Sequence, residues 1–95
     1  MNRLEHLMTI FNEECSEIIQ DTSKALCFGL DDRENGTYPT NQECMRKEFN
    51  QLIAMAEMLE AEGVDLSPDH KVRRDKKENV ERYLGVSKTL GTLSA

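Results

Sequence analysis

Apolar residues recur at spacings of three and four in two long stretches of the chain, the pattern of amphipathic helices. The inner stripe of residues 2–28 comprises Leu4, Leu7, Met8, Phe11, Cys15, Ile18, Thr22 and Leu26. In residues 41–63 the aligned apolar positions are Met45, Leu52, Met55 and Leu59. Nearly every residue between Leu52 and Leu59 is apolar. We therefore expect the second helix to be central and covered on two sides.

Capping signals mark where these two helices begin. Asn2 and Glu5 have the spacing of a capping box, and so do Thr40 and Glu43. In such a box each side chain bonds the backbone N–H of the other residue. We therefore expect the first helix to begin near Asn2 and the second directly after Thr40.

Glycines and a loop mark where the two helices end. Gly29 follows the first apolar stripe and Gly63 follows the second, as glycine commonly does just past a helix. Residues 30–39 contain Asn35-Gly36, which disfavours regular structure. The two helices are expected to pack as an antiparallel hairpin.

A third helix is predicted after the hairpin. Ser67 is the expected cap, with Pro68 in the first turn and Asp69 near the positive helix end. A thinner apolar stripe follows, made of Val72, Val80, Tyr83, Leu84 and Leu90. No segment reads as a strand, so the chain is expected to be a single all-α domain over residues 1–95.

Size and charge restrict the partners of such a domain. A chain of 95 residues buries a modest fraction of its surface. Three helices with broad apolar faces cannot all cover one another, so we expect a homo-oligomer. The net charge of −6 argues against a nucleic-acid partner. It does not argue against small phosphate ligands, because a divalent metal can bridge acidic protein to phosphate.

Cysteine spacing and hydropathy indicate the compartment. Cys15, Cys27 and Cys44 lack CxxC or Cys/His spacing, which argues against a disulfide framework and against zinc. Acidic residues in the first turns are unlike a signal peptide. No apolar run approaches the roughly 20 residues that span a bilayer. We expect a cytoplasmic protein with no membrane partner.

One glutamate stands among the apolar positions of the second predicted helix. Glu48 is in line with Met45 and Leu52, three before and four after it, so it points at a core. A carboxylate in that position costs several kcal/mol unless it is paired or binds a metal. Two interpretations stay open: an ion pair with Arg46 or Lys47 of a neighbouring subunit, and a cation site.

Acids of the first predicted helix could complete a cation site. Glu14 lies at the edge of the inner stripe, Glu17 is three residues on, and Glu13 is more exposed. Solvated surface charge is the alternative interpretation of these acids. Antiparallel packing could bring them to Glu48 and Gln51, and hard divalent cations prefer such oxygen ligands.

Two basic features could meet a phosphate. Lys24 is a candidate substrate-binding residue, although a solvated lysine paired with Asp21 is the alternative. Residues 71–77 form the main basic cluster. This cluster is either a solvated helix face or a positively charged surface that steers nucleotide phosphates toward the acidic residues.

Several short motifs follow one another along residues 4–63. They are Glu-Glu-Cys-Ser-Glu at 13–17, Lys24-Ala25-Leu26, Phe28-Gly29-Leu30, Glu48-x-x-Gln51 and Ala54-x-x-Glu57-Met58-Leu59. Together they resemble the MazG-like nucleotide pyrophosphohydrolases, and most closely the small single-domain members often encoded by bacteriophages. The third helix matches only loosely.

The resemblance implies a fold, a reaction and a set of roles. Helices from two subunits would build a four-helix bundle, as a dimer or tetramer. The implied reaction is Mg²⁺-dependent cleavage of (deoxy)nucleoside triphosphates to monophosphate and pyrophosphate, with Mn²⁺ as an alternative ion. Glu14, Glu17 and Glu48 would be metal ligands. Glu13 would help to orient the attacking water or a second ion.

One departure from the family pattern leaves more than one functional prediction open. Gln51 stands where the family has aspartate. Glutamine can offer Mg²⁺ a carbonyl oxygen but brings no charge and cannot act as a base. Cys27 also stands where a basic residue is frequent. The protein is therefore either an active or weakened pyrophosphohydrolase, or an inactive relative that binds or sequesters a nucleotide or nucleotide signal. A helical scaffold without a ligand is a third option.

Overall fold

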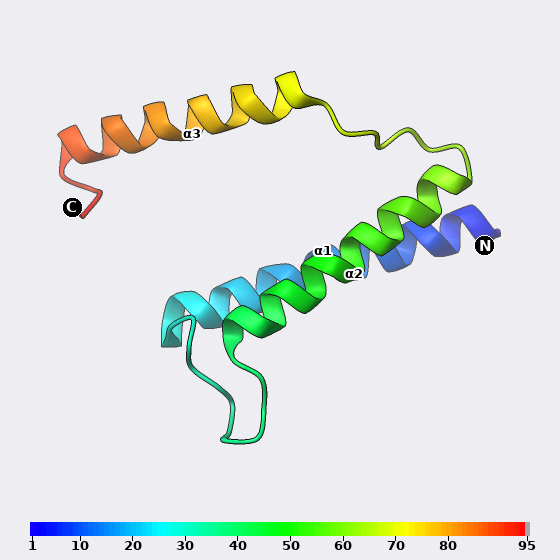
Figure 1. The fold of residues 1–95 in the computed structure, drawn as a ribbon, viewed down its shortest axis with the longest axis horizontal. Coiled ribbons are helices and arrows are strands. Elements are labelled where there is room, and N and C mark those ends of the chain that lie inside the picture. The colour runs from blue at the N-terminus through cyan, green and yellow to red at the C-terminus, as the bar shows by residue number, and fades with distance from the viewer. Residues whose placement is uncertain (95) are drawn as a thin grey trace.

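Three helices make up the architecture in the computed structural model, which describes residues 1–94 (Figure 1). They are α1 (Arg3–Phe28), α2 (Asn41–Ala61) and α3 (His70–Leu90). The described residues contain no strand, only an isolated bridge between Arg33 and Thr40. This confirms the predicted all-α class. The predicted domain, residues 1–95, includes Ala95, which lies outside the described residues.

The ends of α1 follow the predicted capping signals. Asn2 Oδ1 accepts a hydrogen bond from the backbone N–H of Glu5 at 2.8 Å, which is one of the two bonds of a capping box. Gly29 follows the helix with φ +100°, and its N–H donates to Ala25 O at 2.8 Å. Glycine adopts this backbone region without the steric cost of a Cβ.

The start of α2 is as predicted, but its end comes earlier. Thr40 Oγ1 accepts from Glu43 N at 3.1 Å, and Glu43 Oε1 accepts from Thr40 N at 3.3 Å, so the capping box is complete. The helix ends at Ala61 and not at Gly63. The N–H of Glu62 bonds to Leu59 O at 3.0 Å, three residues back, which tightens the last turn and stops the α-helical ladder.

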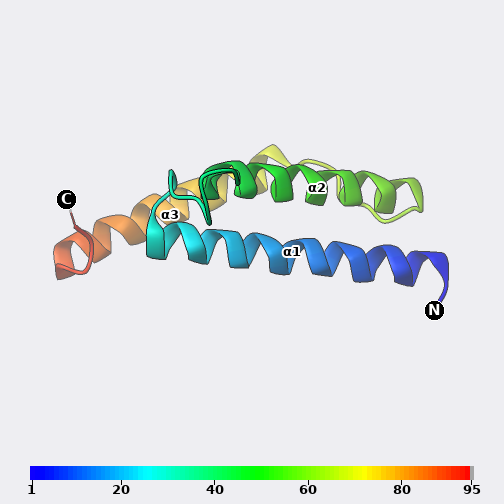
Figure 2. The ribbon, with the colours of Figure 1, turned by 90° about the horizontal axis from the view of Figure 1, so that it is seen from below.

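α1 and α2 form the expected antiparallel hairpin: α2 lies in front of α1 in Figure 1, and Figure 2 shows the two helices side by side. The core lies toward its open end, where Leu7, Met55 and Leu59 are buried. Arg3 Nε and Glu62 Oε1 form an ion pair of 2.7 Å across that end. At the other end the Asn41 side chain donates to Gly29 O at 2.9 Å. These contacts fix the register between the two helices.

Two residues of the predicted inner stripe are not inside. Met8 is 54% exposed and Leu26 is 83% exposed. Met8 directly follows the buried Leu7, and Leu26 directly follows the half-buried Ala25. Consecutive helix residues lie about 100° apart, so both side chains fall on the flank of α1. The prediction was wrong for these two positions.

Within one chain α2 is covered on one side, and not on two as predicted. Among the described residues α2 packs only against α1, and α3 contacts neither helix. Phe49, Ile53 and Met58 are consequently 55%, 42% and 41% exposed. Figure 1 shows α3 set apart from the hairpin and joined to it by an extended linker.

α3 begins later than predicted, because the expected cap has another partner. The hydroxyl and the N–H of Ser67 both donate to Asp65 Oδ1, at 2.6 and 3.0 Å. Asp69 caps the helix instead, and its Oδ1 accepts from Val72 N at 3.0 Å. Pro68 therefore precedes the helix. No helix in residues 1–94 has both the length and the apolar character needed to cross a membrane.

Candidate functional site

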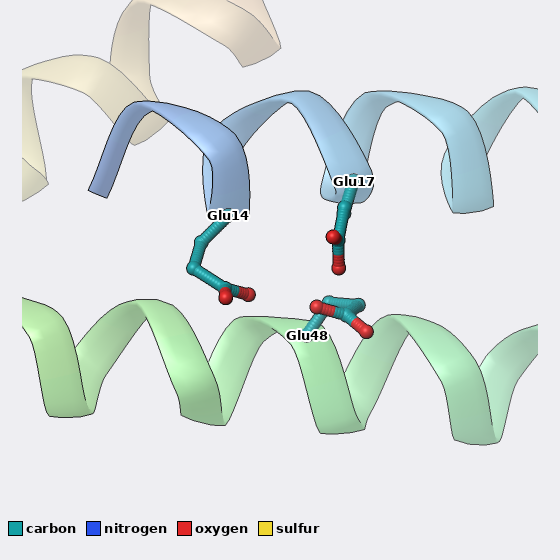
Figure 3. Close-up of side chains that lie close together, drawn as sticks. All are labelled: Glu14, Glu17 and Glu48. Atoms are coloured by element: carbon teal, nitrogen blue, oxygen red, sulfur yellow. The ribbon is translucent and has the colours of Figure 1, made fainter. Parts of the chain in front are cut away.

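Three carboxylates from two helices converge midway along the hairpin. Glu14 and Glu17 extend from α1, and Glu48 extends from α2 toward them (Figure 3). One oxygen from each residue lies within 4.8 Å of the others. Glu14 and Glu48 are half-buried, whereas Glu17 is exposed. We call these three residues the acidic site; it opens to solvent beside Glu17.

Helix geometry explains why these side chains meet. Glu14 and Glu17 are three residues apart and so share one side of α1. Glu48 follows half-buried Met45 by three residues and precedes half-buried Leu52 by four, which turns it toward α1. Antiparallel packing then sets Glu48 opposite the two acids, as the sequence indicated.

Gln51 completes the cluster as a hydrogen-bond donor. With the nitrogen of its side-chain amide turned toward the acids, Nε2 donates to Glu48 Oε2 at 2.8 Å and to Glu14 Oε2 at 3.1 Å. With the amide turned the other way, its oxygen would face only acceptors. Gln51 thus holds the two half-buried carboxylates together, a contact that an aspartate could not make in its charged form.

Nearby carboxylates change the pKa of one acid in the site. A side-chain hydrogen bond with Glu48 and the negative charge of Glu48 raise the pKa of Glu17 above its ordinary value of 4.5, while Lys47 opposes the shift. Carboxyl groups at this separation are stabilised by a shared proton or by a cation between them. The donors are all oxygen atoms, which suit a hard divalent cation such as Mg²⁺ or Mn²⁺.

The alternative of an ion pair finds no support within one chain. The ion pairs among the described residues join Arg3 to Glu62 and Lys71 to Asp75. Neither involves Glu48, which lies beside Glu14, Glu17 and Gln51. Pairing with a basic residue of a second subunit stays a prediction.

The remaining predicted residues lie outside the acidic site. Glu13 is exposed and outside the group of converging carboxylates. Lys24 is seven residues beyond Glu17, or about 10 Å along α1. It lines a cavity of about 440 Å³ between the end of α1, the loop and the start of α2. The basic run of residues 71–77 lies on α3, away from the acidic site of its own chain.

The cavity contains residues that the sequence did not single out. Arg33 and Tyr38 from the loop line it, and so does Phe28, which the sequence indicated only as part of a motif. Arg33 Nη1 donates to Tyr38 O at 2.9 Å, which holds the guanidinium against the loop. No periodic signal exists in residues 30–39, so only the folded loop reveals that Arg33 and Lys24 line one cavity.

Comparisons of the chain with protein-family models, with curated proteins and with solved structures find no match. The MazG-like resemblance therefore stays a prediction. The function has to be inferred from the acidic site and from the cavity that lies next to it.

Proposed function

We propose that this protein is a Mg²⁺-dependent nucleoside triphosphate pyrophosphohydrolase that converts a (d)NTP to a (d)NMP and pyrophosphate. The observation that carries the proposal is the convergence of Glu14, Glu17 and Glu48 from two helices, with oxygens within 4.8 Å of one another. The MazG-like motifs on which these residues lie point to the same reaction.

The acidic site supplies the expected metal ligands. Glu14, Glu17 and Glu48 would hold Mg²⁺ or Mn²⁺, and Gln51 would offer its carbonyl oxygen after its amide rotates. A bound divalent ion neutralises phosphate charge and lowers the pKa of a coordinated water. Glu13 lies one turn before Glu17 on the same flank of α1. From there it would orient a water at the open side of the site.

The adjacent cavity suits the rest of a nucleotide. Its volume of about 440 Å³ is in the range typical of small-molecule sites, roughly 300–1,000 Å³. Phe28 and Tyr38 offer aromatic surface to a nucleobase, since every base has a face that can stack. Lys24 and Arg33 supply positive charge for phosphate oxygens, and Asp21, Asp32 and Glu34 also line the cavity. Charges of both signs thus line the cavity, and the two basic side chains are the ones that would meet phosphate.

A second candidate function is nucleotide binding without cleavage. The observation that favours it is Gln51, whose amide bonds both half-buried carboxylates and adds no charge. Fewer negative ligands bind Mg²⁺ more weakly, and an amide cannot act as a general base. In that case the protein would sequester a nucleotide or a nucleotide signal and release it unchanged.

The proposal includes self-association and a compartment. We expect a homo-oligomer, a dimer or tetramer, in which the hairpins of two copies form a four-helix bundle. The small buried core and the exposed Phe49, Ile53 and Met58 support self-association, without distinguishing a second hairpin from another helix as the contacting surface. The expected location is the bacterial cytoplasm, including that of a phage-infected cell, with a nucleotide and not a nucleic acid as the ligand.

Product analysis tests the function directly. The full chain is incubated with a panel of nucleoside triphosphates, with and without Mg²⁺, and products are separated by chromatography. We expect monophosphate and pyrophosphate only with Mg²⁺, and their loss in Glu48→Gln. Glu60→Gln, an exposed position on the same helix, serves as the matched control.

Other outcomes distinguish the two candidates. A nucleotide that stabilises the protein and is recovered intact would favour binding without cleavage. Absence of both products and stabilisation across the panel would contradict both functions.

A further inference from the structure

The hairpin has an uncovered apolar side opposite the acidic site. Ile19 is two residues after Glu17, and Ile53 is two residues after Gln51. Residues two apart lie about 200° apart around a helix, so both isoleucines point away from the site. They are 66% and 42% exposed.

Further apolar residues extend this side along both helices. Met8, Ile19 and Leu26 follow one flank of α1, and Phe49 and Ile53 follow the corresponding flank of α2; we call these five residues the apolar face. Beside Met8 lies a hollow of about 670 Å³ that Leu59 and Val64 also line. Surface of this kind is typical of an interaction site.

α3 carries an apolar stripe that is also without a partner. Val72, Tyr83 and Leu90 are 63%, 63% and 72% exposed, and they share one side of the helix with Val80 and Val86. α3 contacts neither other helix among the described residues. It has the same length as α2, 21 residues or about 32 Å, so it can follow α2 from end to end.

The net charge of α3 is opposite in sign to that of the hairpin. Residues 1–63 contain 13 acidic and 5 basic residues, a net charge of −8. α3 contains 7 basic and 3 acidic residues, a net charge of +4. Arg73 and Lys77 lie beside Val80 on one flank of the apolar stripe and would remain near the acidic hairpin when the stripe is covered. Such complementarity steers association and disfavours pairing of two α3 helices with each other.

We propose that α3 of one copy packs on the apolar face of a second copy, and that the second copy returns the contact. The linker of residues 62–69 already carries α3 away from its own hairpin (Figure 1). Reciprocal exchange covers the apolar stripe and the apolar face of both copies, and it leaves both acidic sites open on the opposite side. This inference does not depend on the proposed activity, and it has α3, not a second hairpin, cover Phe49 and Ile53.

Complementation between two variants of the full chain tests the exchange. Tyr83→Asp changes the α3 stripe and Ile53→Asp changes the apolar face, while Thr89→Asp and Asn50→Asp add the same charge on the outer sides of α3 and α2. Sedimentation equilibrium measures dimerisation, and circular dichroism verifies the helical content. We expect the first two variants each to raise the dimer dissociation constant about tenfold or more, which corresponds to about 1.4 kcal/mol. The controls should match the unmodified chain.

An equimolar mixture of Tyr83→Asp and Ile53→Asp tests whether the α3 stripe of one copy contacts the apolar face of the other. In a mixed pair one contact joins an intact α3 to an intact apolar face, so dimers should reappear. A monomeric unmodified chain would overturn the proposal, because α3 would then fold back on its own hairpin. Dimers that survive either substitution unweakened, or a mixture no better than its components, would overturn it as well.

Discussion

At the scale of single residues, Gln51 controls how the acidic site behaves. Its amide joins Glu14 to Glu48 through hydrogen bonds of 3.1 and 2.8 Å, so it holds the two carboxylates together without a metal. These hydrogen bonds stabilise the site when no metal is bound. A bound cation therefore adds less stability than it would without them. The balance between the two candidate functions therefore depends on this position.

Replacing Gln51 with aspartate should strengthen the response to Mg²⁺. Gln51→Asp adds a fourth carboxylate, so the metal-free protein should become less stable through repulsion while Mg²⁺ binds more tightly. Tenfold tighter binding adds about 1.4 kcal/mol of Mg²⁺-dependent stabilisation, or roughly 6–11 °C in Tm for a domain of this size. Thermal unfolding with and without Mg²⁺ measures the effect, with Asn50→Asp as the control. An unchanged Mg²⁺ response would show that residue 51 does not face a cation.

Glu17 gives the site a dependence on pH in the absence of divalent ions. The pKa of Glu17 is raised in the folded protein, chiefly by its hydrogen bond with Glu48 and by the charge of Glu48. The folded state therefore holds this proton more tightly than the unfolded state, and the contribution of Glu17 to stability is lost as pH rises through the raised pKa. At neutral pH the neutral variant Glu17→Gln should melt at a higher temperature than the unmodified protein.

That advantage should shrink as the pH falls toward the ordinary glutamate range. Melting curves of the two proteins across this interval, recorded in a chelating buffer, measure the difference in Tm. A difference in Tm that is constant with pH would mean that Glu17 neither shares a proton with Glu48 nor is repelled by its charge.

The sequence anticipated much of this site, for reasons that are specific to each residue. Glu48 could be placed because it interrupts a regular apolar stripe, and Glu14 and Glu17 because their spacing sets them on one side of a helix. The contact of Gln51 with both acids could not be predicted, since it depends on the register of α1 against α2. Arg33 was missed because a loop has no periodicity from which to infer direction.

At the scale of elements, caps determine where the helices begin and end. Glycine at positive φ follows α1, and a complete capping box opens α2. Both were readable from the sequence because capping is local. Ser67 shows the limit of this reasoning: it had the right type for a cap, but a nearby aspartate accepts its hydrogen bonds and Asp69 takes the role.

Removing the cap of α2 should destabilise the hairpin. Thr40→Ala eliminates the side-chain oxygen that accepts from Glu43 N, and loss of such a cap costs about 1 kcal/mol. Urea unfolding followed by circular dichroism measures the change. Thr9→Ala is the control, because the Thr9 hydroxyl bonds only to Glu5 O and Met1 Sδ at an exposed position. Equal effects of the two substitutions would refute the role of the cap.

At the scale of the whole molecule, the position of α3 is the feature that the sequence did not reveal. An apolar stripe indicates that a helix packs against another surface, but it does not identify that surface. The apolar run of α2 between Leu52 and Leu59 led to the expectation that α2 is central and covered on two sides. The hairpin instead stands alone, and only Leu7, Met55 and Leu59 are buried apolar residues among those described.

Stability should consequently depend on protein concentration. If copies associate through the exposed apolar surface, assembly stabilises the folded state by mass action and Tm rises with concentration. Differential scanning calorimetry over a wide range of concentrations measures this dependence. A Tm that does not change with concentration would contradict the homo-oligomer.

The most direct test of the central claim, a divalent-cation site between α1 and α2, is a Mn²⁺ titration followed by electron paramagnetic resonance of the free ion. The unmodified chain should take up Mn²⁺ stoichiometrically, and Mg²⁺ should displace it. Glu48→Gln should abolish most of this uptake, whereas Glu60→Gln should leave it intact. Equal uptake by the unmodified chain and Glu48→Gln would show that the converging carboxylates are not a metal site.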